Sequence, residues 1–274
     1  MGTFFEQTIG LDRAEVIARV LNTQTDSYGY IEIPVLSRQL RQYRSGSVLD
    51  IGSGDGSFLF KVAAKNPHMD FVGVEHNPEF FKKALSRLEE TKLSNVELRQ
   101  TFFDSQYAGK HEVILARFTL QHASKPQEFI RSVYHAICSE GCFMCIDPIY
   151  DYYDSQPPEK VWQGFRERML VTYERWGSNP NVPKTACKWV SEAGFESIRA
   201  TINIYSPVTI GYDRFKEVVL ATAAMFHLDH PDLWGASFLQ ELEEWLQNLS
   251  GDPFISIAHI IAYKGSTTTR ERGS

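Results

Sequence analysis

The chain has 274 residues, 43% of them hydrophobic and 23% charged, which is typical of a globular protein with a substantial core. Its formal net charge is -6, whereas nucleic-acid binders usually carry a basic excess, so we expect no nucleic-acid partner. The sequence has no apolar run of the roughly 18 residues that a membrane span needs, and no secretory signal. With four cysteines, this predicts a protein of the reducing cytoplasm.

From residue 46 onward, short β-rich runs alternate with helical patterns. The expected strands are 47–51, 71–75, 96–100, 112–116 and 142–147. The expected helices are 57–65, a segment that Asn77 caps before Pro78, and a segment with apolar positions 129, 130, 133 and 137 that Gly141 ends. Strands that alternate with helices predict a parallel sheet, whose ligands bind at the carboxyl ends of the strands.

Beyond residue 150 the pattern changes. Helices are expected near 159–175, 183–195, 213–228 and 238–249, and strands at 197–204 and 254–263. In the first of these strands, Ile198, Ala200, Ile202 and Ile204 share one face. We expect residues 1–44 to form a helical cover, 45–264 the main domain with lid insertions at about 148–182 and 206–252, and 265–274 a disordered tail.

A glycine-rich loop follows the first strand in the sequence VLDIGSGDG (48–56). A dinucleotide site has the spacing G-x-G-x-x-G, whereas Gly52, Gly54 and Gly56 have the spacing G-x-G-x-G. Asp50 would repel a pyrophosphate but suits an ammonium or sulfonium group. Glu75 ends the second strand, where a carboxylate can bond both ribose hydroxyls. The pattern therefore predicts a nucleoside with a cationic chain, such as S-adenosylmethionine.

The sequence resembles the class I S-adenosylmethionine-dependent methyltransferases of the small-molecule type. The resemblance is carried, in order, by VLDIGSGDG (48–56), VGVEHN (72–77), EVILARFTLQH (112–122), GCFMCID (141–147) and VSEAGFESIRATI (190–202). It implies a Rossmann-like, three-layer α/β sandwich. The sheet would have seven strands, mostly parallel with an antiparallel last strand, and helical insertions would form lids.

The same motifs imply which residues bind the cofactor. The implied positions are Asp50, Gly52, Ser53 and Gly54 at the methionine part, Glu75 at the ribose, His76 and Asn77 at the adenine edge, and Arg117 after the fourth strand. The chain departs from many relatives after the third strand, where Thr101, Phe102 and Phe103 replace Gly-Asp-Ala. Phe103 is therefore expected to pack on the adenine and Asp104 to replace the missing acid.

Methyl transfer to a hydroxyl, an ammonium group or carbon needs a base that takes a proton. His122, Tyr28 and Asp147 are the candidate catalytic residues, and each has a structural alternative: a capping histidine, a packing aromatic and a turn cap. The lids are rich in aromatic residues and predict a closed apolar pocket for a small planar or hydrophobic acceptor. The candidate substrate-binding residues are Tyr150, Tyr153, Trp162, Phe226 and His227.

Two apparent metal motifs are interpreted as structural. Cys138, Cys142 and Cys145 have a spacing used for iron–sulfur clusters. However, Cys138 is expected to end a helix, and the other two to face opposite sides of a strand. His227 and His230 flank a helix end, where capping is the simpler role. We therefore predict no metal site.

The leading interpretation is a methyltransferase that modifies oxygen, nitrogen or carbon of a small aromatic or hydrophobic metabolite, with secondary metabolism as a candidate setting. The alternative is an enzyme of the same fold that binds S-adenosylmethionine but catalyses a cyclisation or another non-methylating reaction. The residues ARFTLQH after the fourth strand lack the Asn/Asp-Pro-Pro-Tyr signature of base-amine and glutamine-amide methylation. The oligomeric state stays open, a homodimer included.

Overall fold

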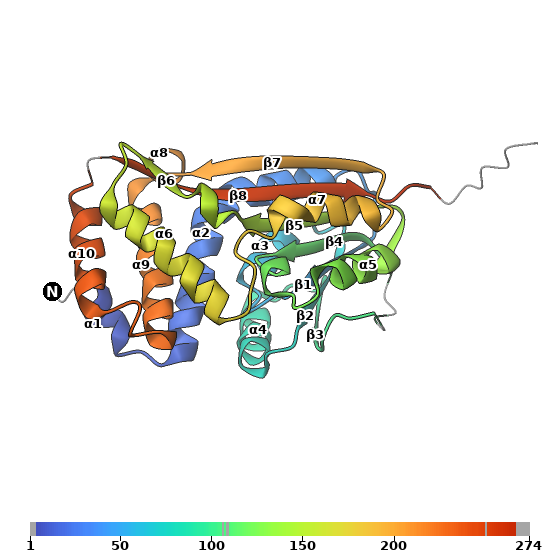
Figure 1. Cartoon of the computed structure of the whole chain (residues 1–274). Helices are drawn as coiled ribbons and strands as arrows, with labels where there is room; N and C mark the ends of the chain where they lie inside the picture. Colours follow the sequence, from blue (N-terminus) through green and yellow to red (C-terminus); the bar gives the residue numbers. More distant parts are fainter. Residues whose placement is uncertain (1–3, 106, 108–109, 250, 267–274) are drawn as a thin grey trace, which may run out of the picture.

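The computed structural model describes residues 4–105, 107, 110–249 and 251–266. The last part of the predicted tail, 267–274, lies outside these residues. The described residues form one mixed sheet with helices on both faces, and a group of further helices lies beyond one end of the strands (Figure 1). This is the Rossmann-like three-layer sandwich expected from the sequence.

Seven of the eight strands match strands expected from the sequence, and β6 is a short additional one. The strands are β1 (Ser47–Ile51), β2 (Asp70–Glu75), β3 (Val96–Gln100), β4 (His111–Arg117), β5 (Ile137–Pro148), β6 (Asp154–Gln156), β7 (Ser197–Tyr205) and β8 (Asp252–Tyr263). Strands β1 to β5 are parallel in the order β3-β2-β1-β4-β5, and β8 pairs antiparallel with β5, β6 and β7. The antiparallel last strand is therefore confirmed.

Side chains alternate along each strand, so both faces of the sheet carry apolar residues, and helices cover both. In β4, Val113 and Leu115 pack in one core, and Ile114 and Ala116 pack in the other. The first core includes α2 (Arg13–Leu40), α3 (Ser57–Lys65) and α4 (Pro78–Thr91). The second includes α5 (Pro126–Ala136) and α7 (Pro183–Glu192).

The remaining helices lie beyond the carboxyl ends of the parallel strands, on the left in Figure 1. They are α1 (Phe4–Ile9), α6 (Lys160–Arg175), α8 (Pro207–Ile210), α9 (Tyr212–Asp229) and α10 (Ala236–Gln247), with the short turns η1 (Leu120–His122) and η2 (Tyr150–Tyr152). Helix α2 packs along α9, and Arg13 of α2 forms a bidentate ion pair with Asp229 of α9, at 2.8 and 3.1 Å. These helices therefore cover the edge of the sheet where ligands of such folds bind.

The predicted boundary between the fifth strand and its preceding helix is wrong. Helix α5 ends at Ala136, and Ile137 already pairs with His111 of β4, so Cys138 lies in a strand rather than at a helix end. Gly141 is needed inside this strand because a Cβ there would lie 2.9 Å from the backbone oxygens of Cys138 and Glu112. The glycine thus permits close backbone contact at an irregular part of the ladder rather than helix termination.

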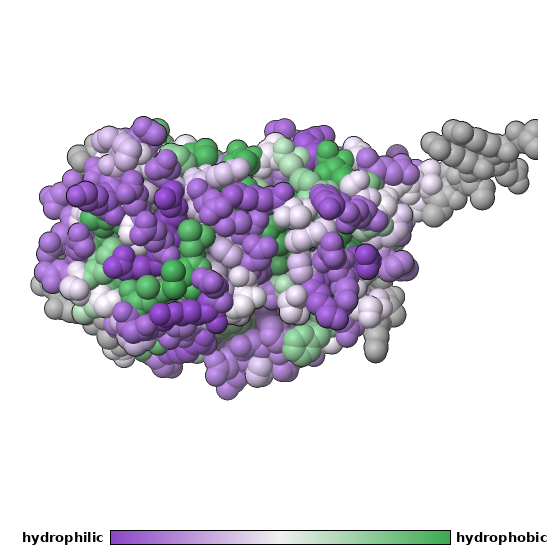
Figure 2. All heavy atoms as spheres, viewed as in Figure 1, coloured by the Kyte–Doolittle hydropathy of each residue, from purple (hydrophilic) through white to green (hydrophobic). Residues whose placement is uncertain are grey.

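The face shown in Figure 2 is mostly hydrophilic, as expected for a chain with 23% charged residues. Smaller hydrophobic groups lie between the hydrophilic side chains. Among the helices of the described ranges, none combines the length and the apolar character that crossing a membrane requires.

We expect Gly141→Ala to lower the free energy of unfolding by about 1–3 kcal/mol, because the added methyl group must displace backbone atoms. Urea denaturation measures this change. Gly10→Ala is the matched control, since nothing lies within 4 Å of a Cβ at that position. Equal stability of the Gly141 variant and the unchanged protein would contradict the close-contact role.

Candidate functional site

A groove of about 750 Å³ opens at the carboxyl ends of β1, β2 and β4. A second, smaller space of about 40 Å³ adjoins it, between α2, α6 and α9, and we call it the aromatic cavity. Gln24, Phe118, Gln121, Tyr173 and Met225 line both spaces, so the cavity forms the inner end of the groove.

The glycine-rich loop forms one wall of the groove. Gly52 and Gly54 have φ angles of 72° and 58°, which side chains rarely adopt. A Cβ on Gly52 would also lie 2.7 Å from Thr119 Oγ1. The N–H groups of Gly52 and Ser53 donate to the carbonyl oxygen of Val74, at 2.8 and 3.1 Å, which holds the loop against β2.

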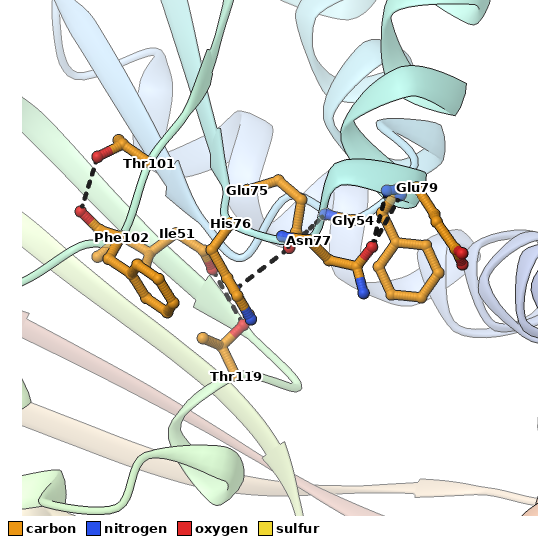
Figure 3. Close-up of polar contacts among 10 residues, drawn as sticks. Ile51, Gly54, Glu75, His76, Asn77, Glu79, Thr101, Phe102 and Thr119 are labelled. Atoms are coloured by element: carbon orange, nitrogen blue, oxygen red, sulfur yellow. Dashed lines mark hydrogen bonds and ion pairs between the residues drawn. The ribbon is translucent and has the colours of Figure 1, made fainter.

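Glu75 connects this loop to the start of α4. Its Oε2 accepts a hydrogen bond from the Gly54 N–H at 3.0 Å, and its Oε1 accepts one from the Asn77 N–H at 2.7 Å (Figure 3). The ring of His76 lies beside the same carboxylate, at 3.4 Å. A carboxylate has about four acceptor positions, so Glu75 retains acceptor capacity for the two hydroxyls of a ribose.

Asp50 and Arg117 lie at the ends of neighbouring strands β1 and β4. Burial raises the pKa of the Asp50 carboxyl to about 7, although the positive charge of Arg117 acts in the opposite direction. The Arg117 guanidinium lies 4.4 Å from the ring centres of both Phe58 and Phe118. Asp50 is thus a buried acidic group at the groove whose ionised form a cationic ligand would stabilise.

Arg117 has a partner that the sequence interpretation missed. Its Nε donates to Oε2 of Glu32 at 2.6 Å, and Glu32 is completely buried in the middle of α2. Burial raises the pKa of Glu32, whereas Arg117 lowers it. A single glutamate among the apolar residues of YIEIP (30–34) gives only a weak signal, because most helical glutamates are solvent-exposed.

Aromatic residues form the opposite end of the groove. Phe102 is 70% exposed and stacks on the His76 ring at a centroid distance of 4.5 Å. Phe103 packs against Phe129 at 5.5 Å, and Asp104 also lines the groove. This end of the groove therefore offers aromatic surface that a base can pack against.

The structure brings every predicted cofactor-binding residue to this groove. They are Asp50, Gly52, Ser53, Gly54, Glu75, His76, Asn77, Phe103, Asp104 and Arg117. The set offers carboxylates for a cationic group and for ribose hydroxyls, and aromatic surface for a base. These residues fit S-adenosylmethionine.

His122 lines the groove beside Gln121, which lines both spaces, and ends the short 3₁₀ helix η1 after β4. Its Nδ1 is 3.1 Å from Ser178 Oγ, and its ring stacks on Tyr173 at 5.7 Å. The surrounding protein lowers the pKa of His122 to about 4, although part of the ring still faces the open groove. The imidazole is therefore neutral near pH 7 and able to accept a proton.

The other two catalytic candidates occupy different positions. Asp147 is fully buried and does not line the groove; its Oδ2 accepts a hydrogen bond from Cys145 Sγ at 3.3 Å, and the nearby backbone N–H groups of Leu120 and Gln121 act to lower its pKa. It therefore holds the turn that carries His122, as in its turn-cap alternative. Tyr28 of α2 lines the aromatic cavity, and its ring meets that of Phe118 edge-on.

Only some of the candidate substrate-binding residues line the aromatic cavity. Tyr150, Tyr153 and Phe226 line the aromatic cavity. Trp162 does not, because it is fully buried against Phe165 within the helical group. His227 does not either, since its Nδ1 bonds the carbonyl oxygen of Trp234 at 2.7 Å. The expectation that these last two residues touch the substrate is corrected accordingly.

The cysteine geometry agrees with the prediction for the fifth strand. Cys142 packs in the core under α2 and α3, and Cys145 packs in the core under α5 and α7, so the two face opposite sides of the sheet. No group of three or more His, Cys, Asp or Glu side chains that could hold a metal ion occurs in the part of the chain that the structure describes.

Comparisons with known proteins identify the family of the chain. A sequence model of the family described as "Methyltransferase domain" matches residues 44–196, more than half of the chain. Carboxy-S-adenosyl-L-methionine synthase of Nautilia profundicola is 22% identical over 171 residues, which cover 55% of this chain and 70% of that protein.

Two solved structures show the same fold. The [4+2]-cyclase SpnF has a TM-score of 0.58 and 17% identity, over 85% of this chain and 80% of SpnF. The plantazolicin methyltransferase BpumL in complex with SAH has a TM-score of 0.55 and 15% identity, over 91% and 89% of the two chains. With the family match and the residues of the groove, the chain belongs to the class I methyltransferases that use S-adenosylmethionine as their cofactor.

Proposed function

We propose that this methyltransferase acts on a small, largely apolar acceptor that lies in the groove with one end at the aromatic cavity. The observation that carries the proposal is the cavity itself. Mostly aromatic and aliphatic side chains from α2, α6 and α9 line it, and it shares five lining residues with the groove that the cofactor loop borders. A narrow inner end of this kind, with a few polar groups, suits part of a small molecule better than a protein or a nucleic acid.

The cofactor positions follow from the same geometry. We assign the ammonium and sulfonium end to the neighbourhood of Asp50, the ribose to Glu75, and the adenine to the end of the groove near Phe103 and His76. Bound S-adenosylmethionine supplies a methyl group that is already activated for transfer. The protein then chiefly aligns the acceptor and excludes water, and alignment of this kind contributes roughly 7–11 kcal/mol.

His122 is the proposed base. It lies at the junction of the groove and the cavity, its imidazole is neutral near pH 7, and no charged partner occupies its Nδ1. When the acceptor is a hydroxyl or an ammonium group, His122 takes its proton.

Four free cysteines also support the cytoplasmic location expected from the sequence.

We expect Glu75→Ala to weaken the binding of S-adenosylhomocysteine by about 1.5–3 kcal/mol, since it removes hydrogen bonds to a charged group. Isothermal titration calorimetry measures the change. Glu79→Ala is the control, because Glu79 is an exposed carboxylate nearby that does not line the groove. An affinity that Glu75→Ala leaves unchanged would remove the ribose role.

The raised pKa of Asp50 predicts a pH dependence of cofactor binding. In the free protein the carboxyl is protonated below about pH 7, and it must lose this proton to meet the ligand's ammonium group. The affinity for S-adenosylhomocysteine should therefore fall as the pH decreases from 8 to 6, by up to about tenfold per unit below pH 7. Titrations at pH 6, 7 and 8 test this, and Asp50→Asn should flatten the profile. The same slope in both proteins would assign the titration to another group.

Incubation with a panel of small hydroxylated and amino aromatic compounds tests the function itself. We expect release of S-adenosylhomocysteine with at least one of them. His122→Ala should then reduce kcat about 10²–10⁴-fold without changing cofactor affinity, whereas the exposed control His135→Ala should remain active. Full activity of His122→Ala would leave it a structural role only. Conversion of a compound without release of S-adenosylhomocysteine would favour the non-methylating alternative. The fold similarity to the [4+2]-cyclase SpnF is the reason to test for this outcome.

A further inference from the structure

The junction between the groove and the aromatic cavity has features that go beyond an apolar acceptor. The cavity of about 40 Å³ holds only a few water molecules, at roughly 10–15 Å³ for each. The body of an acceptor must therefore lie in the groove, and only a small group can reach the junction. What the junction offers to that group decides which acceptors fit.

Charge is the first constraint. Among the described residues that line the cavity, none is acidic or basic; the polar ones carry amide or hydroxyl groups. A charged group that moved there would lose its hydration without gaining a counter-ion, which is strongly unfavourable. The inner end of the acceptor should therefore be uncharged.

Gln121 supplies the second constraint. It lines both spaces but is only 3% exposed, and its Nε2 is 3.4 Å from the carbonyl oxygen of Phe118. Its Oε1 is buried and has no hydrogen-bond partner within the described ranges. Leaving such an acceptor unpaired costs about 1–3 kcal/mol, and an unpaired buried group in a native protein needs an explanation. A donor on a bound ligand would supply one.

The neighbours of Gln121 hold it beside the proposed base. Asp147 lies beside the backbone N–H groups of Leu120 and Gln121, and the Asn179 N–H donates to the Gln121 carbonyl oxygen at 2.9 Å. Tyr173, whose hydroxyl accepts a hydrogen bond from Tyr150 at 2.6 Å, contacts the Gln121 side chain and stacks on the ring of His122. Gln121 and His122 are therefore neighbours on one short helix that share Tyr173 as a contact.

We propose that the side-chain oxygen of Gln121 accepts a hydrogen bond from an uncharged hydroxyl or amine of the acceptor and thereby selects acceptors that carry such a donor. The proposal rests on the function proposed above and narrows its substrate class. Gln121 is a specificity-determining residue in this role, and His122 remains the proton acceptor.

The test compares phenol with toluene, which has nearly the same shape but no donor. Ligand-observed NMR titrations at saturating S-adenosylhomocysteine give both affinities for the full chain. We expect the ratio of phenol to toluene affinity to fall about five- to tenfold in Gln121→Met, which keeps the side-chain length but removes the acceptor. Gln121→Glu, which burial keeps in its neutral form, retains an acceptor oxygen and should keep the ratio. Gln127→Met, at an exposed position outside both spaces, is the control.

The outcomes separate this proposal from the function on which it rests. An unchanged ratio in Gln121→Met, with both compounds bound, would overturn the role of Gln121 and leave the small apolar acceptor standing. Binding of benzoate as tight as that of phenol would overturn the requirement for an uncharged group. If the protein binds S-adenosylhomocysteine but neither phenol nor toluene, the proposed function fails, and the selection by Gln121 fails with it.

Discussion

The buried ion pair between Arg117 and Glu32 joins the two halves of the site. Arg117 ends β4 in the sheet, and Glu32 belongs to α2, which covers the groove. Both side chains are almost inaccessible to water, so neither charge is stable there without the other. Removing one partner of a buried pair typically costs 3–5 kcal/mol, because the remaining charge is left without compensation. The position of α2 against the carboxyl end of β4 is therefore fixed by charge as well as by packing.

Around this ion pair, burial raises the pKa of some groups and lowers the pKa of others. It raises the pKa of Asp50 and of Asp147 to about 7 and lowers that of His122 to about 4. Both changes favour the neutral forms of these three groups. The same burial separates the roles of these residues: Asp50 lines the groove, whereas Asp147 faces the backbone of the turn behind it.

The residues that line this groove could be predicted from the sequence because they follow the ends of strands. Once the strands are identified, a parallel sheet brings the residues after β1, β2 and β4 to one edge. The acceptor side could not be predicted in the same way. Trp162 and Tyr150 are both aromatic lid residues, yet one is in the helical core and the other lines the cavity, and only packing distinguishes them. Glu32 was missed because α2 has no strong one-sided pattern and includes Pro34 in its interior. Ile202 and Ile204 share a face as expected, but they are 50% and 42% exposed on a strand that pairs only with β8.

Helix α2 is attached at many points along its length, among them Arg13 to Asp229 of α9, Glu32 to Arg117, and Gln39, which accepts a hydrogen bond from the Tyr263 hydroxyl. The ion pair between Glu32 and Arg117 thereby fixes α2 against the sheet. Helices α6 and α9 contribute side chains to the cavity, but no buried ion pair among the described residues links them to the sheet. Substitutions on α6 and α9 can therefore reshape the acceptor end while the donor end keeps its geometry. Changes confined to α6 and α9 thus alter the lining of the aromatic cavity while the glycine-rich loop and Glu75, on separate elements, keep their sequence.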